Sequence, residues 1–406
     1  MIQTDSPNRC CGCLACSIVC PRKCIERVED AAGFVTVRVD VSKCVQCGLC
    51  EQVCPLQKDY PAPDFTNASA YGAYASDNAV RGRASSGGMF ETIAKTFLEK
   101  GGSVFGCKLD ENLQLRMHEA TTLEQVQQLT KSKYIQSDCH DSFPVIKARL
   151  QGEKHVLVCA TPCQIAALKN YLGELAAAPQ LLLMDFFCHG VPSQQFFDKC
   201  CEYIEKKLKG RLLSYTFRFR PPHARMLHYV RYRYQVGQDM KEKVCFYFKD
   251  PFYYGFEKYI TLRDSCYHCP FGTGNHMADI TVGDLHEAEK YWAEKNLYEG
   301  VSKVIINTPK GQHLWAQIRS GLCVKELPVE ELCKSRAMFA SATSMPAARV
   351  AFMKDLKGLP FEQVVKKWLS PWAIEKNIYY RLPDWIRKPL KKVCLFSRQF
   401  YKGVRK

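Results

Sequence analysis

Residues 10–21 read CCGCLACSIVCP and residues 44–55 read CVQCGLCEQVCP, so one cysteine pattern occurs twice near the start of the chain. Both copies place three cysteines two residues apart, a fourth three residues further on, and a proline directly after it. Three thiolates at this spacing bind one [4Fe–4S] cluster, while the fourth reaches the neighbouring cluster. The pattern therefore predicts two [4Fe–4S] clusters, one held by Cys10, Cys13, Cys16 and Cys54 and the other by Cys44, Cys47, Cys50 and Cys20.

Zinc is the alternative for each set, because zinc also binds four thiolates. Zinc modules, however, pair two cysteines with a distant second pair and do not need three cysteines in step before a proline. The repeated spacing therefore favours iron–sulfur clusters and a role in electron transfer. Cys11 and Cys24 lie beside the pattern without fitting it, and we expect both to be structural.

The composition is that of a folded protein in a reducing compartment. The chain has 406 residues, 47% of them hydrophobic and 12% aromatic, which is enough for a core in each of two or three domains. Its start lacks the apolar stretch of a secretory signal, and no apolar run is long enough to span a bilayer. We therefore expect a cytoplasmic protein, in which many of the 23 cysteines are metal ligands.

About half of the net charge of +16 lies in residues 371–406, which hold ten lysines and arginines against two acidic residues. Apolar side chains accompany these charges from Trp372 onward. The segment suits a peripheral contact with an anionic membrane or with an acidic protein, and packing against its own domain is an equally good interpretation. We expect no nucleic-acid partner, because no recognisable binding module accompanies the basic residues.

Periodicity divides the chain into three parts: residues 1–60, 61–310 and 311–406. Strands at 70–75 and 103–107 flank a helix at 89–98, and strands at 156–160 and 181–187 flank a helix at 164–172, which predicts two parallel βαβ units. A capping-box pattern starts a further helix at Thr121. Between Leu213 and Phe248, aromatic residues alternate with arginines, as in antiparallel strands with one arginine-rich face.

The expected fold class is therefore mixed α+β and α/β. A bacterial-ferredoxin-like domain precedes an α/β domain that has parallel βαβ units and an antiparallel insertion. The last part is expected to be a C-terminal helical region that ends in the basic amphipathic tail.

Six short motifs occur in a fixed order along the chain: RASSGG at 83–88, SKYIQS at 132–137, TPCQ at 161–164, CHGVPS at 188–193, RDSCYHC at 263–269 and ADITVGD at 278–284. In this order they resemble the family of coenzyme F420 hydrogenase/dehydrogenase beta subunits, in the bacterial form with an N-terminal double-cluster ferredoxin domain. The resemblance runs from Cys10 to about Asn307 and implies FAD together with iron–sulfur clusters. Archaeal members use coenzyme F420, but no residue here matches contacts with that deazaflavin.

Two of these motifs are candidates for flavin contacts. The amides of a Ser/Gly loop and the start of the next helix suit the pyrophosphate of FAD, and an ordinary helix cap is the alternative. That loop and its added charge comprise Arg83, Ser85, Ser86, Gly87 and Gly88. Lys133 and Tyr134 suit the phosphates or the isoalloxazine edge, and the alternative is a lysine reaching solvent beside a buried tyrosine.

Four further cysteines predict a third [4Fe–4S] cluster. Cys163 and Cys188 each follow a predicted parallel strand, so both thiols are expected at the edge where such sheets bind ligands. Cys266 and Cys269 complete the four thiolates that one cluster needs. The alternative is two buried packing thiols plus a separate Cys-x-x-Cys redox pair or half of a zinc site.

His189 follows Cys188 and could relay protons to a reduced flavin or to the substrate, although a structural histidine is the more frequent case. Asp284 ends a motif in which a ligand-orienting role and a turn role are equally plausible. An anionic small-molecule substrate would suit the arginine-rich face, for which exposure to solvent is the default expectation. Its residues are Arg218, Arg220, Arg231 and Arg233.

These features together predict a flavin-dependent iron–sulfur oxidoreductase. It would pass electrons between ferredoxin-type clusters, FAD and an unidentified substrate, and would exchange electrons with a redox partner protein or a soluble donor. The alternative is an accessory electron-transfer subunit of a larger redox complex that has no substrate site of its own.

Overall fold

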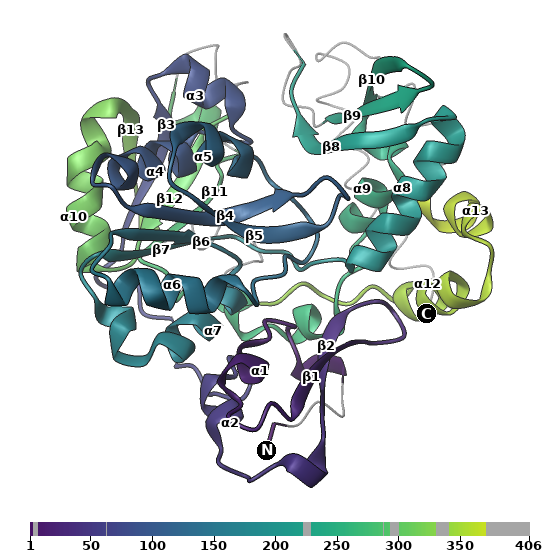
Figure 1. The fold of residues 1–406 in the computed structure, drawn as a ribbon. Coiled ribbons are helices and arrows are strands. Elements are labelled where there is room, and N and C mark those ends of the chain that lie inside the picture. The colour runs from purple at the N-terminus through teal and green to yellow at the C-terminus, as the bar shows by residue number, and fades with distance from the viewer. Residues whose placement is uncertain are drawn as a thin grey trace, which may run out of the picture.

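The two apolar runs predicted as neighbouring buried strands lie at the centre of an eight-stranded sheet in the computed structural model (Figure 1). β6 (Val156–Cys159) and β7 (Leu181–Phe186) pair in parallel and are joined by α7 (Pro162–Leu172). This βαβ unit is therefore confirmed. The strand order across the sheet is β13-β3-β12-β11-β7-β6-β4-β5.

The structure describes residues 1–2, 7–61, 63–221, 229–286, 288–292, 300–329 and 341–370. The predicted basic tail lies outside these residues. Among the helices in these ranges, none has the length and apolar character that crossing a membrane requires.

The sheet mixes parallel and antiparallel strands. Its other strands are β3 (Ser69–Ala75), β4 (Ser103–Leu109), β5 (Leu115–Ala120), β11 (Ile280–Asp284), β12 (Ser302–Ile306) and β13 (Leu322–Leu327). Strands β4, β6, β7 and β11 run parallel, whereas β5, β12, β3 and β13 each pair antiparallel with a neighbour. Because β13 pairs with β3, the sheet continues beyond the domain boundary predicted at residue 310.

The βαβ unit predicted over residues 70–107 needs a correction. β3 and β4 run in the same direction, but β12, β11, β7 and β6 separate them, so α4 (Met89–Glu99) crosses much of the sheet. β3 instead pairs with two strands from the C-terminal half of the chain. A local pattern cannot reveal those distant partners. The helix predicted from Thr121 also begins later, because the capping box is formed by Thr122 and Gln125.

Helices cover both faces of the sheet. α4, α5 (Leu123–Leu129) and α10 (Pro309–Ile318) lie on one face, where Leu157 joins a buried cluster with Ile93 and Trp315. α6 (Ser142–Gln151) and α7 lie on the other face, where Val158 joins a second cluster. Successive residues of β6 thus enter opposite layers, which explains why the whole strand is apolar.

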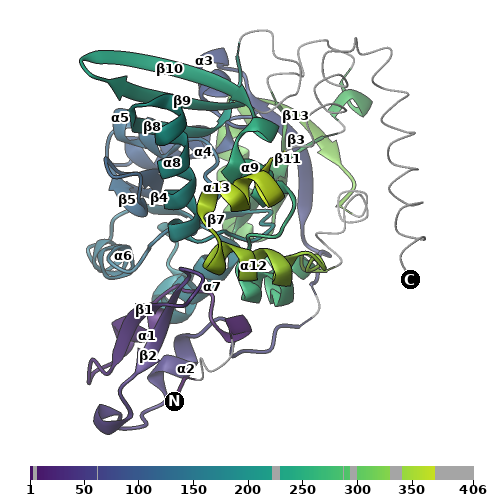
Figure 2. The ribbon, with the colours of Figure 1, turned by 90° about the vertical axis from the view of Figure 1, so that its right-hand side faces the viewer.

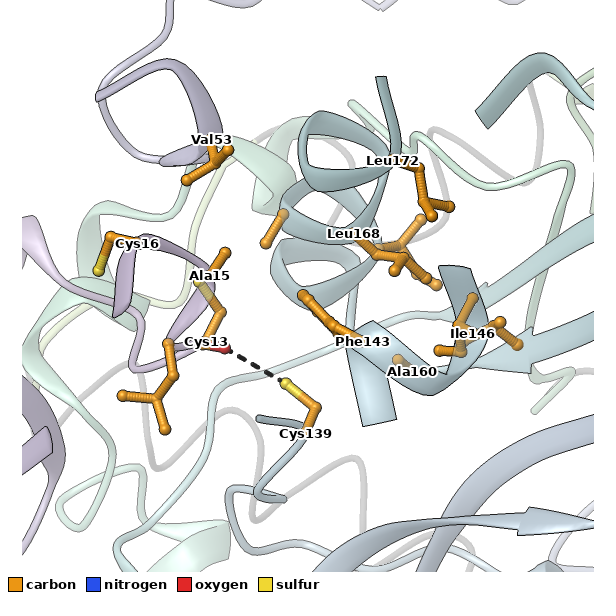
Figure 3. Close-up of a cluster of buried hydrophobic side chains, with 14 of the residues drawn as sticks. Cys13, Ala15, Cys16, Val53, Cys139, Phe143, Ile146, Ala160, Leu168 and Leu172 are labelled. Carbon is orange, nitrogen blue, oxygen red and sulfur yellow. Dashed lines mark hydrogen bonds between the residues drawn. The ribbon is translucent and has the colours of Figure 1, made fainter. Parts of the chain in front are cut away.

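The cysteine-rich N-terminal part packs below α6 and α7 (Figure 1). It contains α1 (Ala15–Val19), α2 (Leu49–Val53) and an antiparallel hairpin of β1 (Ile25–Glu29) and β2 (Val35–Val39). Figure 3 shows the Cys139 thiol directed at the carbonyl oxygen of Cys13, 3.5 Å away. The two parts therefore share one buried cluster. The ferredoxin-like fold of residues 1–60 stays a prediction.

The predicted antiparallel insertion is confirmed as a three-stranded sheet of β8 (Arg211–Phe219), β9 (Tyr229–Val236) and β10 (Asp239–Phe246). Figure 2 shows this sheet beside four helices, α8 (Gln194–Leu208), α9 (Pro251–Glu257), α12 (Arg349–Gly358) and α13 (Phe361–Val364). Phe197, Phe217 and Phe352 belong to the buried cluster that joins them. The default expectation of a solvent-exposed arginine face is wrong for Arg218, which is buried.

Candidate functional site

A cavity of about 310 Å³ opens at the carboxyl ends of the parallel strands. Its wall includes Cys107 of β4, Ala160 after β6, Cys188 after β7 and Gly283 of β11. Open α/β sheets bind ligands at this position, because the loops that leave adjacent strands diverge there. The cavity therefore lies where the fold provides space for a cofactor or a substrate.

The Ser/Gly loop forms another part of the cavity wall. Ser85, Ser86 and Gly88 line it, together with the first turn of α4. Arg83 lies outside the wall, and its guanidinium pairs at 2.7 Å with the buried carboxylate of Glu91. The charge of Arg83 thus braces the loop against α4.

Gly87 also lies outside the wall, where it is held between β3 and β12. Its N–H donates to Ser302 Oγ at 2.9 Å, and its carbonyl accepts from the Ala75 N–H at 2.7 Å. A Cβ at Gly87 would stand 2.3 Å from the carbonyl oxygen of Ala73. The close approach of the loop backbone to β3 and β12 therefore requires glycine here.

Lys133 and Tyr134 both line the cavity. The Lys133 ammonium donates to the carbonyl oxygens of Leu129 and Thr130, each at 2.6 Å, which places it at the end of α5. Packing around the ammonium lowers the pKa of Lys133 to about 8. The Tyr134 ring packs 4.6 Å from that of Phe256, between centroids, so Tyr134 is part of an aromatic wall.

A buried ion pair in the wall was not predicted as a pair. Arg218 Nη1 of β8 donates to Asp284 Oδ2 of β11 at 2.7 Å, which joins the insertion to the large sheet. In the described part of the chain, the buried Arg218 Nε has no hydrogen-bond acceptor. Lys131 and Lys303 add further positive charge to the wall. This side of the cavity therefore suits an anionic or acceptor-rich ligand.

The other arginines of the predicted face lie differently. Arg220 donates to the carbonyl oxygen of Ser85 and so connects the end of β8 to the Ser/Gly loop. Arg231 stacks on Phe219 at 4.4 Å from the ring centroid, and Arg233 pairs with Glu242 at 3.3 Å. Only Arg218 of the four lies among the described residues that line the cavity.

His189 lines the cavity and already has a structural contact. Its ring stacks on Tyr259 with centroids 5.7 Å apart, and its Nδ1 lies 3.2 Å from the Tyr259 hydroxyl. Its carbonyl oxygen accepts from Thr343 at 2.7 Å. A proton-relay role for His189 stays a prediction.

The four cysteines proposed for a third cluster come together beside the cavity. Burial raises the pKa of the Cys188 thiol, and so do the thiols of Cys266, Cys163 and Cys269 nearby. Burial likewise raises the pKa of Cys266 to about 11 and that of Cys269 to about 12. A Cβ at Gly190 would stand 3.3 Å from Cys266 Sγ, so this glycine leaves room for the thiol.

The repeated cysteines also gather in two places. Cys20, Cys44, Cys47 and Cys50 line one hollow at the surface. Cys16 has the thiols of Cys10, Cys54 and Cys50 as neighbours, so the assignment of each cysteine to one of the two clusters stays a prediction. Backbone amides approach the sulfurs: Gly12 N–H lies 3.3 Å from Cys10 Sγ, and Ile2 N–H lies 3.4 Å from Cys50 Sγ.

No group of three or more His, Cys, Asp or Glu side chains in the described ranges is arranged to hold a single metal ion. A cubane differs from a single ion, because each of its cysteines binds a different iron atom. At the third cysteine group, the choice between a cluster and zinc stays a prediction.

Cys11 was expected to be structural, but the structure places it between two cysteine groups. Its thiol contacts those of Cys13 and Cys163. The first group of the N-terminal part and the third group are therefore neighbours through one residue. The CC dipeptide at residues 10–11 is the only sequence signal of this contact, and it does not reveal the distant partner.

Comparison with known proteins gives two family matches. Residues 153–331 match the model of the C-terminal part of the coenzyme F420 hydrogenase/dehydrogenase beta subunit, and residues 9–58 match the 4Fe-4S dicluster domain. The first range contains the four cysteines beside the cavity, and the second contains all eight repeated cysteines. The dicluster match supports iron–sulfur clusters in the N-terminal part.

Two curated relatives are named as subunits of redox enzymes. The F subunit of the F420H2 dehydrogenase of Methanosarcina mazei is 24% identical over 336 residues, which cover 79% of this chain and 85% of the relative. The I subunit of the NADH-quinone oxidoreductase of Pelobacter propionicus is 33% identical over 73 residues, which cover 14% of this chain and 39% of the relative.

Among solved structures, a chain of the F420-reducing [NiFe] hydrogenase complex from Methanosarcina barkeri is similar. It aligns with a TM-score of 0.42 and 16% identity, over 74% of this chain and 91% of that chain.

Gly87→Ala is expected to destabilise the protein by about 1–3 kcal/mol, because the added methyl group would overlap the Ala73 carbonyl. Gly82→Ala in α3 (Asn78–Arg83) is the matched control, since no atom lies within 4 Å of its Cβ position. Thermal denaturation compares the two, and equal melting temperatures would contradict the close approach.

The depressed pKa of Lys133 predicts a pH-dependent stability. Between its folded value of about 8 and its ordinary 10.5, the unfolded chain binds more protons, so stability rises with pH across that window. Between pH 7.5 and 9.5, without added ligand, the free energy of unfolding of the wild type should rise by about 2 kcal/mol relative to that of Lys133→Met.

The groups around this ammonium are the thiols of Cys107 and Cys159, which raise its pKa, and Lys131, which lowers it. Because all three are present in both proteins, the difference between wild type and variant isolates Lys133. Anaerobic denaturation at several pH values measures it, and a difference that does not change with pH would refute the prediction.

Proposed function

Because the chain belongs to the family of coenzyme F420 hydrogenase/dehydrogenase beta subunits through residues 153–331, we propose that it is an iron–sulfur oxidoreductase with a flavin-type cofactor in the cavity. One observation carries the proposal: Cys188 belongs both to the third cysteine group and to the cavity wall. An electron held at that group would lie directly beside a bound ligand.

The cysteine groups are arranged as a path from the surface to the cavity. Cys47 is exposed in the outermost group, and Cys13 of the group with Cys10 accepts a hydrogen bond from Cys139 of the large domain at its carbonyl oxygen. Cys11 then contacts Cys163 of the third group, and Cys188 reaches the cavity. We assign one [4Fe–4S] cluster to each group, and electrons pass along this order in either direction.

The cavity residues fit FAD in three respects. Ser85, Ser86 and Gly88 line the cavity with the first turn of α4, where backbone amides suit a pyrophosphate, and Lys131 and Lys303 offer charge. The unpartnered Nε of Arg218 offers a donor to a ring carbonyl or a phosphate. A bound flavin supplies exchange between two-electron hydride chemistry and single-electron transfer.

Coenzyme F420 is the second candidate for this cavity. The name of the Methanosarcina mazei relative includes the reduced form of this coenzyme, and the positive wall suits its anionic character as well as that of FAD. As a small-molecule substrate it would bind next to the flavin and exchange a hydride with it.

An accessory electron-transfer subunit without its own substrate site is the alternative function. The curated relatives are named as subunits, which favours a stable partner. Such a subunit would hold clusters but release no flavin. The unpartnered donor and the positive wall of the cavity favour the enzyme.

The outermost cysteine group carries a surface that suits a redox partner. Val41 and Val45 are 65% and 57% exposed, and Leu49 is 39% exposed around the exposed Cys47. Two basic side chains, Arg22 and Lys23, are exposed next to Cys20. We infer that an acidic electron-carrier protein docks here. Its negative charge would complement Arg22 and Lys23, and the apolar centre of the interface would cover Val41 and Val45.

Anaerobic purification tests the proposed function. The full chain is expected to hold about twelve iron atoms, which corresponds to three [4Fe–4S] clusters. Acid treatment is expected to release flavin, which is measured by its fluorescence. Cys163→Ser and Cys188→Ser should each lower the iron by about four per chain, whereas Cys323→Ser on β13 should not. Iron unchanged in both variants would reject the third cluster, and clusters without flavin would select the accessory role.

Charge reversal tests the docking surface. Arg22→Glu with Lys23→Glu should slow electron transfer from a reduced, acidic two-cluster ferredoxin by about tenfold at low salt, and added salt should shrink the difference. Stopped-flow spectroscopy measures the rate. Reduction by methyl viologen should not change, because this small reductant needs no docking surface.

The matched control is Lys206→Glu with Lys209→Glu, at the exposed far end of α8. It makes the same change in net charge away from the cysteine groups. Equal rates of electron transfer from the ferredoxin to both double variants would show that Arg22 and Lys23 have no docking role.

A further inference from the structure

Arg263 begins the RDSCYHC motif, and its backbone belongs to the third cysteine group. Its N–H donates to the Val191 carbonyl at 2.9 Å, and its carbonyl accepts from the Cys266 N–H at 3.0 Å. The residue is thus fixed between the loop that follows Cys188 and the loop that carries Cys266.

The side chain of Arg263 extends from there into the N-terminal part. Nη1 donates to the carbonyl oxygen of Cys10 at 3.2 Å, and Nη2 donates to that of Val35 at 2.8 Å. The guanidinium also lies 4.9 Å from the centre of the Phe34 ring. One arginine therefore spans the boundary between two cysteine groups.

Gln136 completes the bridge. Its Oε1 accepts from Arg263 Nε at 3.1 Å, while its Nε2 donates to the carbonyl oxygens of Cys11 and Gly12 at 2.7 and 3.1 Å. The Cys10–Gly12 segment is thereby held by two side chains of the large domain.

The charge of Arg263 has no protein counterpart. Its side chain is 3% exposed, yet no aspartate or glutamate in the described residues forms an ion pair with it. Two other buried arginines differ: Arg218 pairs with Asp284, and Arg349 pairs with Asp264. A buried cation without an anion is strongly unfavourable, so the missing negative charge must come from something bound nearby.

The surrounding cysteines supply that charge when they hold clusters, because they then bind iron as thiolates. Burial and neighbouring thiols raise the pKa of Cys163 and of Cys266, and Arg263 opposes the rise at both. The other polar neighbours that the structure gives to the guanidinium are neutral oxygens.

We propose that Arg263 is the counter-charge shared by the Cys10-containing cluster and the third cluster, and that it raises the reduction potentials of both. The proposal rests on the clusters assigned above. Adding an electron makes a cluster more negative, so a buried positive charge beside it favours the reduced form. The outermost cluster, bound by Cys20, Cys44, Cys47 and Cys50, has Arg22 among its described neighbours, but Arg22 is exposed and water screens its charge.

The test uses the full chain, purified without oxygen, with reduction followed by electron paramagnetic resonance at controlled potentials. Arg263→Gln removes the charge but keeps hydrogen-bond donors, whereas Arg263→Lys keeps the charge but loses the planar fork. We expect glutamine to shift two of the three cluster potentials to lower values. Lysine should leave those two near the wild-type values, and the third should not move in either variant.

Arg149→Met is the control, because it removes an arginine that pairs with Glu119 and contacts no cysteine in the described ranges. An Arg263→Gln variant with full iron and unchanged cluster potentials would overturn the proposal. Equal shifts of the potentials in Arg263→Gln and Arg263→Lys would also overturn it, and so would loss of iron from Arg263→Lys. Wild-type protein without iron would instead reject the proposed function itself. The iron content and the potentials therefore separate the two conclusions.

Discussion

The convergence of four parallel strands at one edge of the sheet is the constraint on which the rest of the structure depends. β4, β6, β7 and β11 all end at the cavity, and two of them are followed by a cysteine of the third group. Backbone pairing fixes the spacing of adjacent strands, and the short segments that follow β6 and β7 then bring the thiols of Cys163 and Cys188 together. The loop with Cys266 and Cys269 folds back onto this edge, where the backbone hydrogen bond from the Arg263 N–H to the Val191 carbonyl oxygen holds it.

Charge is the second constraint, because the site buries many ionisable groups. Arg83 with Glu91 and Arg218 with Asp284 are paired within the protein, so part of the cost of burying their charges is offset while they position loops and strands. Arg263 and the positively charged cavity wall are not balanced in this way. The ion pairs of Arg83 and Arg218 thus stabilise the fold, whereas the charge of Arg263 and the positive charge of the cavity wall would be balanced by a bound anionic group.

The sequence predicted those features that depend on local spacing. The dicluster part, the β6–α7–β7 unit and the antiparallel insertion follow from patterns a few residues long, whereas the assignment of each cysteine to one cluster stays a prediction. Contacts between distant segments could not be predicted in this way. The partners of β3 and the contact of Cys11 with Cys163 depend on how distant segments pack, and the Arg83–Glu91 pair depends on how α3 and α4 are placed on either side of the Ser/Gly loop. Arg218 was assigned to an exposed face because alternation shows which side of a strand a residue occupies, but not what covers that side.

The position of Cys11 links these arguments to function. A cysteine that binds no cluster in either set still contacts one thiol from each of two neighbouring groups, and Gln136 holds its carbonyl from the large domain. The same bridge that closes the boundary between the domains thus lies where, in the proposed function, an electron would cross it. Relative motion of the two parts would break the hydrogen bonds of Arg263 and Gln136 together and separate the cysteine groups. In the proposed function, the same hydrogen bonds would stabilise the boundary and keep the cysteine groups close enough for electron transfer. This accounts for the buried polar side chains at a boundary that apolar residues could have filled.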